Sequence, residues 1–276
     1  MMTLPLNECG KNDGVHFFTT GDGHRIAYRF DGPANGPVLV LANSIATTFH
    51  MWDGQIEELS NHFRVLRYDF RGHGASDAPI GTYSIDRMGR DVVELLDALH
   101  ISKVHFLGLS LGGFVGQWLG IHVPERIDRL ILVTTSSNLG PPETFDRQIA
   151  GVWKAENLSE IADTFLGNWF PPHMLETEGD VISSFRAMIL STNKQGRAGA
   201  YAAIRDSDMH RTIALINSPT LVIAGQYDKV TLPSHNELIA ATVPNAKYVL
   251  LPTVHMPNIE RQADFLKAVF EFLLLK

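Results

Sequence analysis

The sequence has few of the features that mark secreted or membrane-spanning proteins. Cys9 is the only cysteine among 276 residues, so no internal disulfide can form and no cluster of thiolate metal ligands is available. No run approaches the roughly 18 uninterrupted apolar residues of a membrane-spanning helix. The first residues lack a basic segment followed by a long apolar stretch, which argues against a secretory signal. We therefore predict a cytoplasmic protein without a membrane partner.

Positive charge is also scarce. Lys and Arg number 23 against 30 Asp and Glu, and the formal net charge is −7. Without an excess of cations to neutralise phosphates, nucleic acid is not an expected partner. The sequence has neither a clustered set of His and Asp ligands nor a dinucleotide-binding fingerprint, so we expect no metal and no organic cofactor. A small molecule remains the expected partner, and the oligomeric state is left open.

Strand-like and helix-like segments alternate along most of the chain. Residues 14–30 predict a hairpin, because Asp22-Gly23 favours a tight turn between two strands. Residues 84–100 carry apolar side chains at helical spacing behind Ser84, which predicts a helix capped by that serine. Further apolar segments predict strands at 37–43, 63–70, 103–109 and 126–135. The alternation predicts an α/β fold with a mostly parallel sheet and helices on both faces.

The pattern changes between residues 136 and 211, where helical fragments follow one another without a clear strand. Strand–helix alternation then returns and continues to the end of the chain. We therefore expect a helical cap at 136–211, inserted between two parts of one α/β core, residues 1–135 and 212–276. Such an insertion is expected over the carboxyl ends of the strands, where ligand crevices form in open α/β sheets.

The stretch "HFLGLSLGGFVGQ" at 105–117 holds a serine between glycines at a predicted strand-to-helix junction. Gly108-x-Ser110-x-Gly112 fits the nucleophile elbow, in which a tight turn exposes the serine and the glycines relieve crowding. The alternative is a structural turn whose serine only caps the following helix. We predict Ser110 as a nucleophile.

A serine hydroxyl becomes a good nucleophile when a base takes its proton. In this fold the acid and then the histidine follow the serine along the chain. Asp228 and His255 each follow a predicted strand in that order, so we predict them as the acid and the base. Packing or a turn better explains other histidines, among them His73, His100, His105 and His122.

Acyl transfer also needs donors for the oxygen that becomes negative during attack. The backbone N–H of Leu111, directly after the serine, is one predicted donor. The second is expected from the loop after the third strand, "NSIATT" at 43–48. We predict Ile45, with Ser44 as the second choice.

These residues resemble those of the α/β-hydrolases, and more narrowly the 3-oxoadipate enol-lactonases. The resemblance runs over nearly the whole length, and its most telling stretches are "ANSIATTFHMWDGQ" (42–55), "FRVLRYDFRGHGASDAP" (63–79), "LGLSLGGFVGQ" (107–117) and "HMPNIERQADF" (255–265). Asn43-Ser44 is typical of the enol-lactonase group, whereas many hydrolases have histidine-glycine there. The resemblance implies a triad of Ser110, Asp228 and His255, and a structural role for "RGHGASD".

The predicted cap departs from the group, whose members tend to carry a tryptophan and an arginine early in this region. The enol-lactone that the resemblance implies is anionic, and a cation should meet it. Arg147 is a candidate, as are Arg186, Arg197 and His210. A neutral ester or acyl lactone would instead suit an apolar lining. The aromatic candidates for such a lining are Phe145, Trp153 and Trp169.

The function we predict is hydrolysis of a lactone or carboxylic ester through an acyl-enzyme, with 3-oxoadipate enol-lactone as the first candidate substrate. Alternatives on the same triad are a carboxylesterase, an acyl-homoserine lactonase, and enzymes of C–C bond hydrolysis, cyanohydrin cleavage or peracid formation. Serine at position 110 disfavours the aspartate-nucleophile dehalogenases and epoxide hydrolases. A different class of protein that also fits is a ligand receptor that keeps the triad but turns over slowly.

Overall fold

The computed structural model describes residues 14–177 and 179–274, and Cys9 lies outside these residues. Its centre is an eight-stranded sheet in the order β1-β2-β4-β3-β5-β6-β7-β8. The strands are β1 (His16–Thr19), β2 (Arg25–Asp31), β3 (Val38–Ala42), β4 (Arg64–Tyr68), β5 (Val104–Leu109), β6 (Ile127–Val133), β7 (Thr220–Gly225) and β8 (Lys247–Leu251). Strand β2 pairs antiparallel with both of its neighbours, β1 and β4, and all the other neighbouring strands pair parallel. The predicted α/β fold with a mostly parallel sheet is confirmed.

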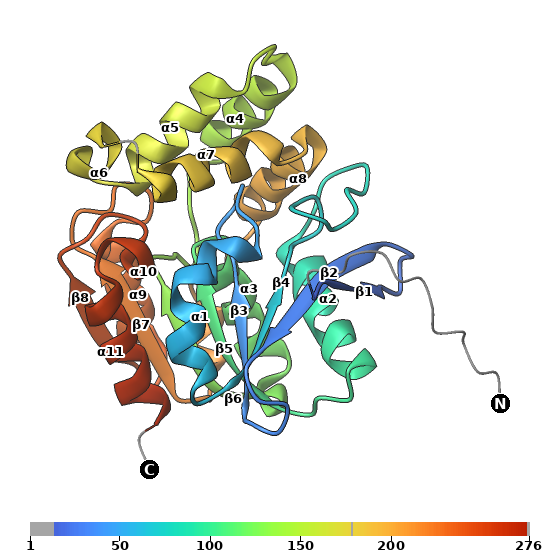
Figure 1. Cartoon of the computed structure of the whole chain (residues 1–276), viewed down its shortest axis with the longest axis vertical. Helices are drawn as coiled ribbons and strands as arrows, with labels where there is room; N and C mark the ends of the chain where they lie inside the picture. The colour runs from blue at the N-terminus through green and yellow to red at the C-terminus, as the bar shows by residue number, and fades with distance from the viewer. Residues whose placement is uncertain (1–13, 178, 275–276) are drawn as a thin grey trace.

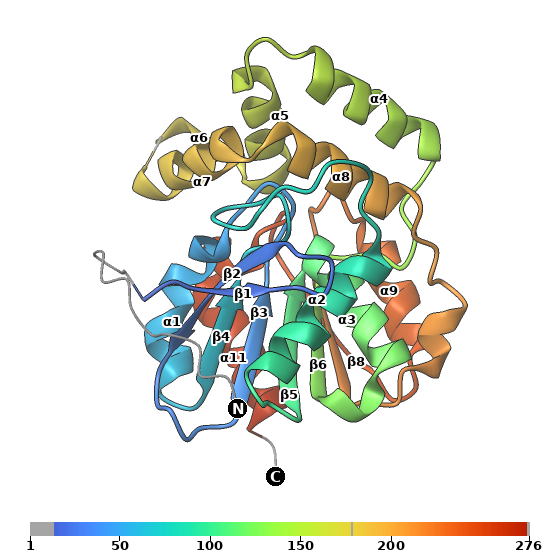
Figure 2. The same ribbon diagram turned by 90° about the vertical axis from the view of Figure 1, so that its right-hand side faces the viewer.

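Helices cover both faces of the sheet. They are α1 (Asp53–Ser60), α2 (Ile85–Ala98), α3 (Leu111–His122), α9 (Pro233–Thr242), α10 (Pro257–Glu260) and α11 (Gln262–Leu273). Helices α1 and α11 lie on one face, and α2, α3 and α9 on the other (Figures 1 and 2). The predicted cap of α2 is confirmed, because the Ser84 hydroxyl accepts a hydrogen bond from the Arg87 amide at 3.1 Å.

Five helices between β6 and β7 form a separate layer above the sheet, shown at the top of Figure 1. We call them the inserted helices: α4 (Pro142–Lys154), α5 (Ser159–Trp169), α6 (Pro172–Glu176), α7 (Asp180–Ser191) and α8 (Lys194–Arg205). The chain leaves and rejoins the sheet at one place, where Asn138 bridges Asp208 and the Met209 amide donates to the Ser137 carbonyl at 2.8 Å. The segment predicted to be helical therefore has its two ends side by side.

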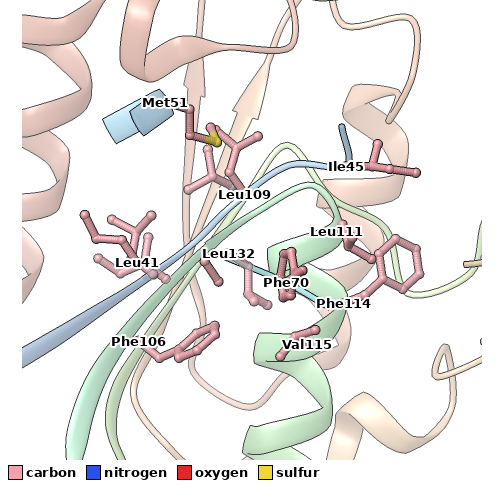
Figure 3. Close-up of a cluster of buried hydrophobic side chains, with 14 of the residues drawn as sticks. Leu41, Ile45, Met51, Phe70, Phe106, Leu109, Leu111, Phe114, Val115 and Leu132 are labelled. Atoms are coloured by element: carbon pink, nitrogen blue, oxygen red, sulfur yellow. The ribbon is translucent and has the colours of Figure 1, made fainter. Parts of the chain in front are cut away.

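The central strands are buried on both faces, as their continuous apolar runs predict. Every residue of β5 is buried, and so is every residue of β7. Figure 3 shows Phe106, Leu109 and Leu132 of β5 and β6 in the same buried cluster as Leu111 and Phe114 at the start of α3. This packing fixes the junction between β5 and α3, where Ser110 lies. In the part of the chain that the structure describes, no helix is long and apolar enough to cross a bilayer.

Candidate active site

Ser110 occupies a forced turn between β5 and α3. Its backbone has φ 55° and ψ −112°, a conformation that residues with a side chain rarely adopt. Hydrogen bonds to the end of β6 and the residues after it help to hold it there: its amide donates to the Val133 carbonyl at 2.9 Å, and its carbonyl accepts from the Thr135 hydroxyl at 2.8 Å. The predicted strand–turn–helix setting of the serine is thus present, and its geometry is more strained than a simple helix cap requires.

The flanking glycines are required by close backbone approach. A Cβ atom on Gly108 would lie 2.1 Å from the Gly112 carbonyl oxygen. A Cβ atom on Gly112 would lie 2.3 Å from the carbonyl oxygen of Ala42, at the end of β3. Both obstacles are backbone atoms, which cannot rotate away as a flexible side chain could.

Replacing Gly112 by alanine is therefore expected to lower the free energy of unfolding by about 2 kcal/mol or more, because β3 and α3 must separate to admit the methyl group. The matched control is Gly167→Ala in α5, where an added Cβ meets no heavy atom within 4 Å. That variant should be neutral or stabilised by up to about 1 kcal/mol, since alanine favours a helix. Urea unfolding of both variants measures the contrast, and equal effects would contradict the steric account.

Asp228 and His255 form a buried hydrogen-bonded pair. The imidazole Nδ1 lies 2.7 Å from the Asp228 Oδ2 atom, and both side chains are 0% exposed. Asp228 follows β7 and His255 follows β8, so the parallel register of these two strands brings them together. The Thr134 hydroxyl donates to the His255 carbonyl at 3.0 Å and ties this loop to the end of β6. The predicted acid and base therefore do meet.

The Asp228 carboxylate also accepts hydrogen bonds from its own loop. The amides of Val230 and Thr231 donate to Oδ1 at 2.8 and 3.2 Å, and the Thr231 hydroxyl donates to Oδ2 at 2.8 Å. Burial acts to raise the pKa of Asp228, but the attraction of His255 and these donors hold that pKa below its usual value. Sequence reasoning missed Thr231, although a threonine three residues after an aspartate is a recognisable spacing for a turn held by side chains.

Ser110 and His255 line the same cavity. No hydrogen bond between them is recorded among the described residues, and the buried His255 Nε2 atom has no partner there. Since Nδ1 pairs with the carboxylate, we assign the proton to Nδ1, which leaves Nε2 as a proton acceptor. Catalytic hydrogen bonds often tighten only when substrate binds, so the contact between Ser110 and His255 stays a prediction.

The two predicted oxyanion donors lie near the serine. Figure 3 shows Ile45 close to Leu111 and Phe114 at the start of α3. Within the described part of the chain, neither the Ile45 amide nor the Leu111 amide has a hydrogen-bond acceptor. The Ser44 amide instead approaches the Met51 sulfur at 3.3 Å, and Ile45 lines the cavity whereas Ser44 does not. The structure thus favours Ile45 over the second choice.

Asn43 fixes this loop. Its side chain donates to the Tyr68 carbonyl at 2.8 Å and accepts from the Trp52 indole at 2.9 Å. Its carbonyl accepts from the Gly112 amide at 3.0 Å, which links the loop directly to the serine turn. The Asn-Ser pair is therefore a structural support for the amides beside it.

The cavity has a volume of about 1030 Å³ and lies between the strand ends and the inserted helices. Its wall on the helical side is mixed. The apolar and aromatic part comes from Phe145, Val152, Ile161, Phe165, Trp169 and Tyr201, and polar or charged residues such as Gln148, Glu156 and Glu160 line the same wall. Phe145 and Trp169 thus lie where sequence analysis expected them, and the Trp169 ring also stacks on the His255 ring with centroids 6.5 Å apart. No group of three or more His, Cys, Asp or Glu within residues 14–177 and 179–274 is placed to hold a metal ion.

Arg147 and Trp153, the other two predicted substrate contacts, do not line the cavity. Trp153 is 52% exposed, and the Arg147 guanidinium donates to the Thr144 hydroxyl on an exposed surface. Phe145 and Val152 lie two helical turns apart on the inner face of α4. The side chains of Arg147 and Trp153 therefore point away from the cavity. Arg147 and Trp153 are therefore not part of the proposed substrate site.

His73 lies in the turn after β4 and is buried, with its Nδ1 atom 3.1 Å from the Arg71 carbonyl oxygen. Burial lowers the pKa of His73 from 6.5 to about 4. As the pH falls through this interval the unfolded chain binds a proton that the folded chain resists, so folding loses stability.

The His73→Gln variant lacks this titration. The stability of the wild-type chain relative to that variant should therefore fall by about 3 kcal/mol between pH 7 and pH 4. Urea unfolding of both proteins across this range measures the difference. If the stability of the two proteins changed with pH in parallel, the His73 ring would have the same pKa in the folded and unfolded chain, which would contradict this prediction.

A family model described as the alpha/beta hydrolase fold matches residues 37–262. The chain belongs to the α/β-hydrolase family. It is 33% identical to 3-oxoadipate enol-lactonase 2 of Acinetobacter baylyi over 256 residues, which cover 92% of this chain and 96% of that protein. The resemblance inferred from the sequence motifs is confirmed.

Solved structures of α/β-hydrolases agree with the fold. A hydrolase from Pseudomonas aeruginosa PA01 superposes with a TM-score of 0.94 at 56% identity, covering 95% of this chain and 99% of that one. An enol-lactonase from Burkholderia xenovorans LB400 gives a TM-score of 0.91 at 37% identity, with coverages of 94% and 100%. A protein named as a carbamate hydrolase, from Agrobacterium fabrum, is 30% identical over 87% of this chain and 94% of its own length. Family membership thus supports a hydrolase and leaves the substrate open.

Proposed function

We propose that this α/β-hydrolase cleaves a lactone or carboxylic ester through an acyl-enzyme formed on Ser110. The observation that carries the proposal is the buried Asp228–His255 pair, whose unpaired Nε2 atom belongs to a ring that lines the same cavity as Ser110. A serine on a strained turn, a histidine with one nitrogen committed to a carboxylate, and unpaired amides nearby are the parts that acyl transfer needs.

In the proposed mechanism His255 Nε2 takes the proton of the Ser110 hydroxyl as its oxygen attacks the substrate carbonyl carbon. The amides of Leu111 and Ile45 donate to the oxygen that becomes negative. His255 then returns the proton to the departing alkoxide, which leaves an acyl ester on Ser110. A water molecule, deprotonated by the same nitrogen, attacks this ester and releases the acid. Asp228 holds the imidazole tautomer and stabilises the imidazolium.

The inserted helices act as a cap in this proposal. Their aromatic side chains form the wall opposite Ser110, and Trp169 lies against the base. Trp169 and His255 are both buried, so the base is shielded from water, which strengthens its hydrogen bonds. The cap and the core then correspond to residues 136–211 and to the two flanking segments 1–135 and 212–276.

Two substrates are supported by different observations. The similarity to enol-lactonases favours 3-oxoadipate enol-lactone. The cavity favours a larger, more apolar ester or acyl lactone, because about 1030 Å³ with an aromatic wall is at the upper end of the range of small-molecule sites, roughly 300–1,000 Å³. We place the enol-lactone first.

A panel of three substrates tests this order: the enol-lactone, an acyl-homoserine lactone and a short nitrophenyl ester. We expect kcat/KM to be at least about tenfold higher for the enol-lactone, or about 1.4 kcal/mol in barrier. A smaller preference would remove the enol-lactone assignment and keep the ester hydrolase. Repeated turnover on any of the three separates an enzyme from a receptor that reacts once.

A further inference from the structure

The cavity meets only two lysine or arginine side chains of the described residues, Lys154 and Lys229. Both are exposed to solvent, and neither has an ion-pair partner among the described residues. The candidates from the sequence for binding an anionic substrate were Arg147, Arg186, Arg197 and His210, and neither lysine was among them. An unpaired cation on the wall of a reaction cavity can bind a carboxylate with little competition from within the protein.

The other cations near the cap are engaged elsewhere. Arg186 pairs with Asp163 at 2.7 Å, and both residues line a second, separate pocket on the inserted helices. His210 lies 2.6 Å from Asp208 on an exposed surface. Arg197 is 0% exposed, donates to the Ile189 carbonyl and does not line the cavity. None of these three side chains is placed to meet a bound substrate.

The two lysines differ in their surroundings. Lys154 ends α4 on the cap side, where Glu156 and Glu160 also line the cavity and offset its charge. Lys229 lies on the core side in the β7–α9 loop, directly after Asp228. Asp228 is buried and hydrogen-bonded to His255, and it forms no ion pair with Lys229 among the described residues. Lys229 is therefore the cation nearest in the chain to the proposed catalytic groups and the less compensated of the two.

Polar side chains also line the wall that carries Lys229. Thr231 and His235 line it as well, and the buried His235 Nδ1 atom has no hydrogen-bond partner among the described residues. Burial lowers the pKa of His235, although the nearby Asp228 opposes this, so the ring adds a neutral polar group and no fixed negative charge. The β7–α9 loop thus offers a cation, whereas the two carboxylates among the cavity's lining residues, Glu156 and Glu160, lie on the cap side.

We propose that Lys229 is the residue that selects substrates by binding a carboxylate on the acyl chain, away from the bond that is cleaved. The site then prefers esters or lactones that carry a second, free carboxylate over their neutral analogues. This inference rests on the proposed function of Ser110, because the carboxylate is bound while the ester is attacked. Neither the fold nor the triad determines whether a second carboxylate is preferred, and in this proposal Lys229 confers that preference.

Two matched substrates test the proposal: 4-nitrophenyl hydrogen glutarate, which ends in a carboxylate, and its methyl ester. The readout is the ratio of kcat/KM for the acid to kcat/KM for the methyl ester. In Lys229→Ala this ratio should fall about tenfold, corresponding to about 1.4 kcal/mol. The loss should lie in KM for the acid, and Lys229→Glu should lower the ratio further. Raising NaCl from 20 to 500 mM should lower the wild-type ratio and leave that of Lys229→Ala nearly constant.

The control is Lys267→Ala, since this lysine is 73% exposed on α11 and outside the cavity. It should keep the wild-type ratio. An unchanged ratio in Lys229→Ala, or a tenfold loss in Lys154→Ala instead, overturns the proposal. Failure of the proposed function would differ, because the wild-type chain would then hydrolyse neither ester or would hydrolyse both without Ser110.

Discussion

Alanine at position 110 is expected to lower kcat/KM for ester hydrolysis by about 10⁴-fold or more. The loss is this large because the hydroxyl is the atom that forms the acyl-enzyme, and removing a nucleophile in such a triad leaves only the contribution of the oxyanion donors and of binding. Initial rates with a nitrophenyl ester measure it. Circular dichroism and thermal unfolding should match the wild type, since the small side chain adds little to packing.

Ser191→Ala is the matched control for this substitution. Ser191 ends α7, outside the cavity, and its hydroxyl donates only to the Met188 carbonyl. The control should retain wild-type activity. If Ser110→Ala also hydrolysed the ester at an undiminished rate, the nucleophile would have to be another group.

Asparagine at position 228 is expected to lower kcat by about 10⁴-fold with a small change in KM. The side chain keeps nearly the same shape, but an amide no longer holds the proton on His255 Nδ1 or stabilises the imidazolium. In the wild-type chain the pKa of Asp228 is held low in spite of burial, so the carboxylate is ionised throughout the neutral range. Steady-state kinetics at neutral pH separates kcat from KM.

Asp264→Asn provides the comparison, because that carboxylate pairs with Arg261 on an exposed surface of α11. It should leave both constants unchanged. A fall of less than tenfold in Asp228→Asn would mean that His255 does not depend on the carboxylate for its orientation or charge, and the proposed triad would lose its acid.

The order of strands and helices and the positions of the proposed triad residues follow from local sequence. Glycine spacing around Ser110 predicts the turn because the collision avoided at Gly108 is with Gly112, four residues further along the chain; the close approach of Gly112 to Ala42 of β3 is visible only in the fold. Asp228 and His255 could be predicted because each directly follows a strand, and parallel strands end at one edge of the sheet. The Ser84 cap is equally local, since one side chain meets one amide.

The substrate contacts could not be predicted in the same way. Which face of α4 turns inward depends on how it packs against α8, and that packing places Phe145 in the cavity and Trp153 outside it. The sequence does not mark Lys229 as a substrate contact, because exposed lysines in loops are common. Only its position on the wall of the cavity distinguishes it from the others. Arg197 illustrates the opposite case: it is a cation that the sequence offers as a candidate, but on α8 its side chain is fully buried.

The covalent intermediate is the most direct test of the account. A fluorophosphonate probe should add to one residue of the wild-type chain, and peptide mass spectrometry should place the adduct on the Ser110 oxygen. Labelling should be absent in Ser110→Ala and slowed at least about 10³-fold in His255→Ala, which lacks the base. Labelling at a different residue, or equally fast labelling of Ser110 without His255, would contradict the proposed nucleophile and its activation.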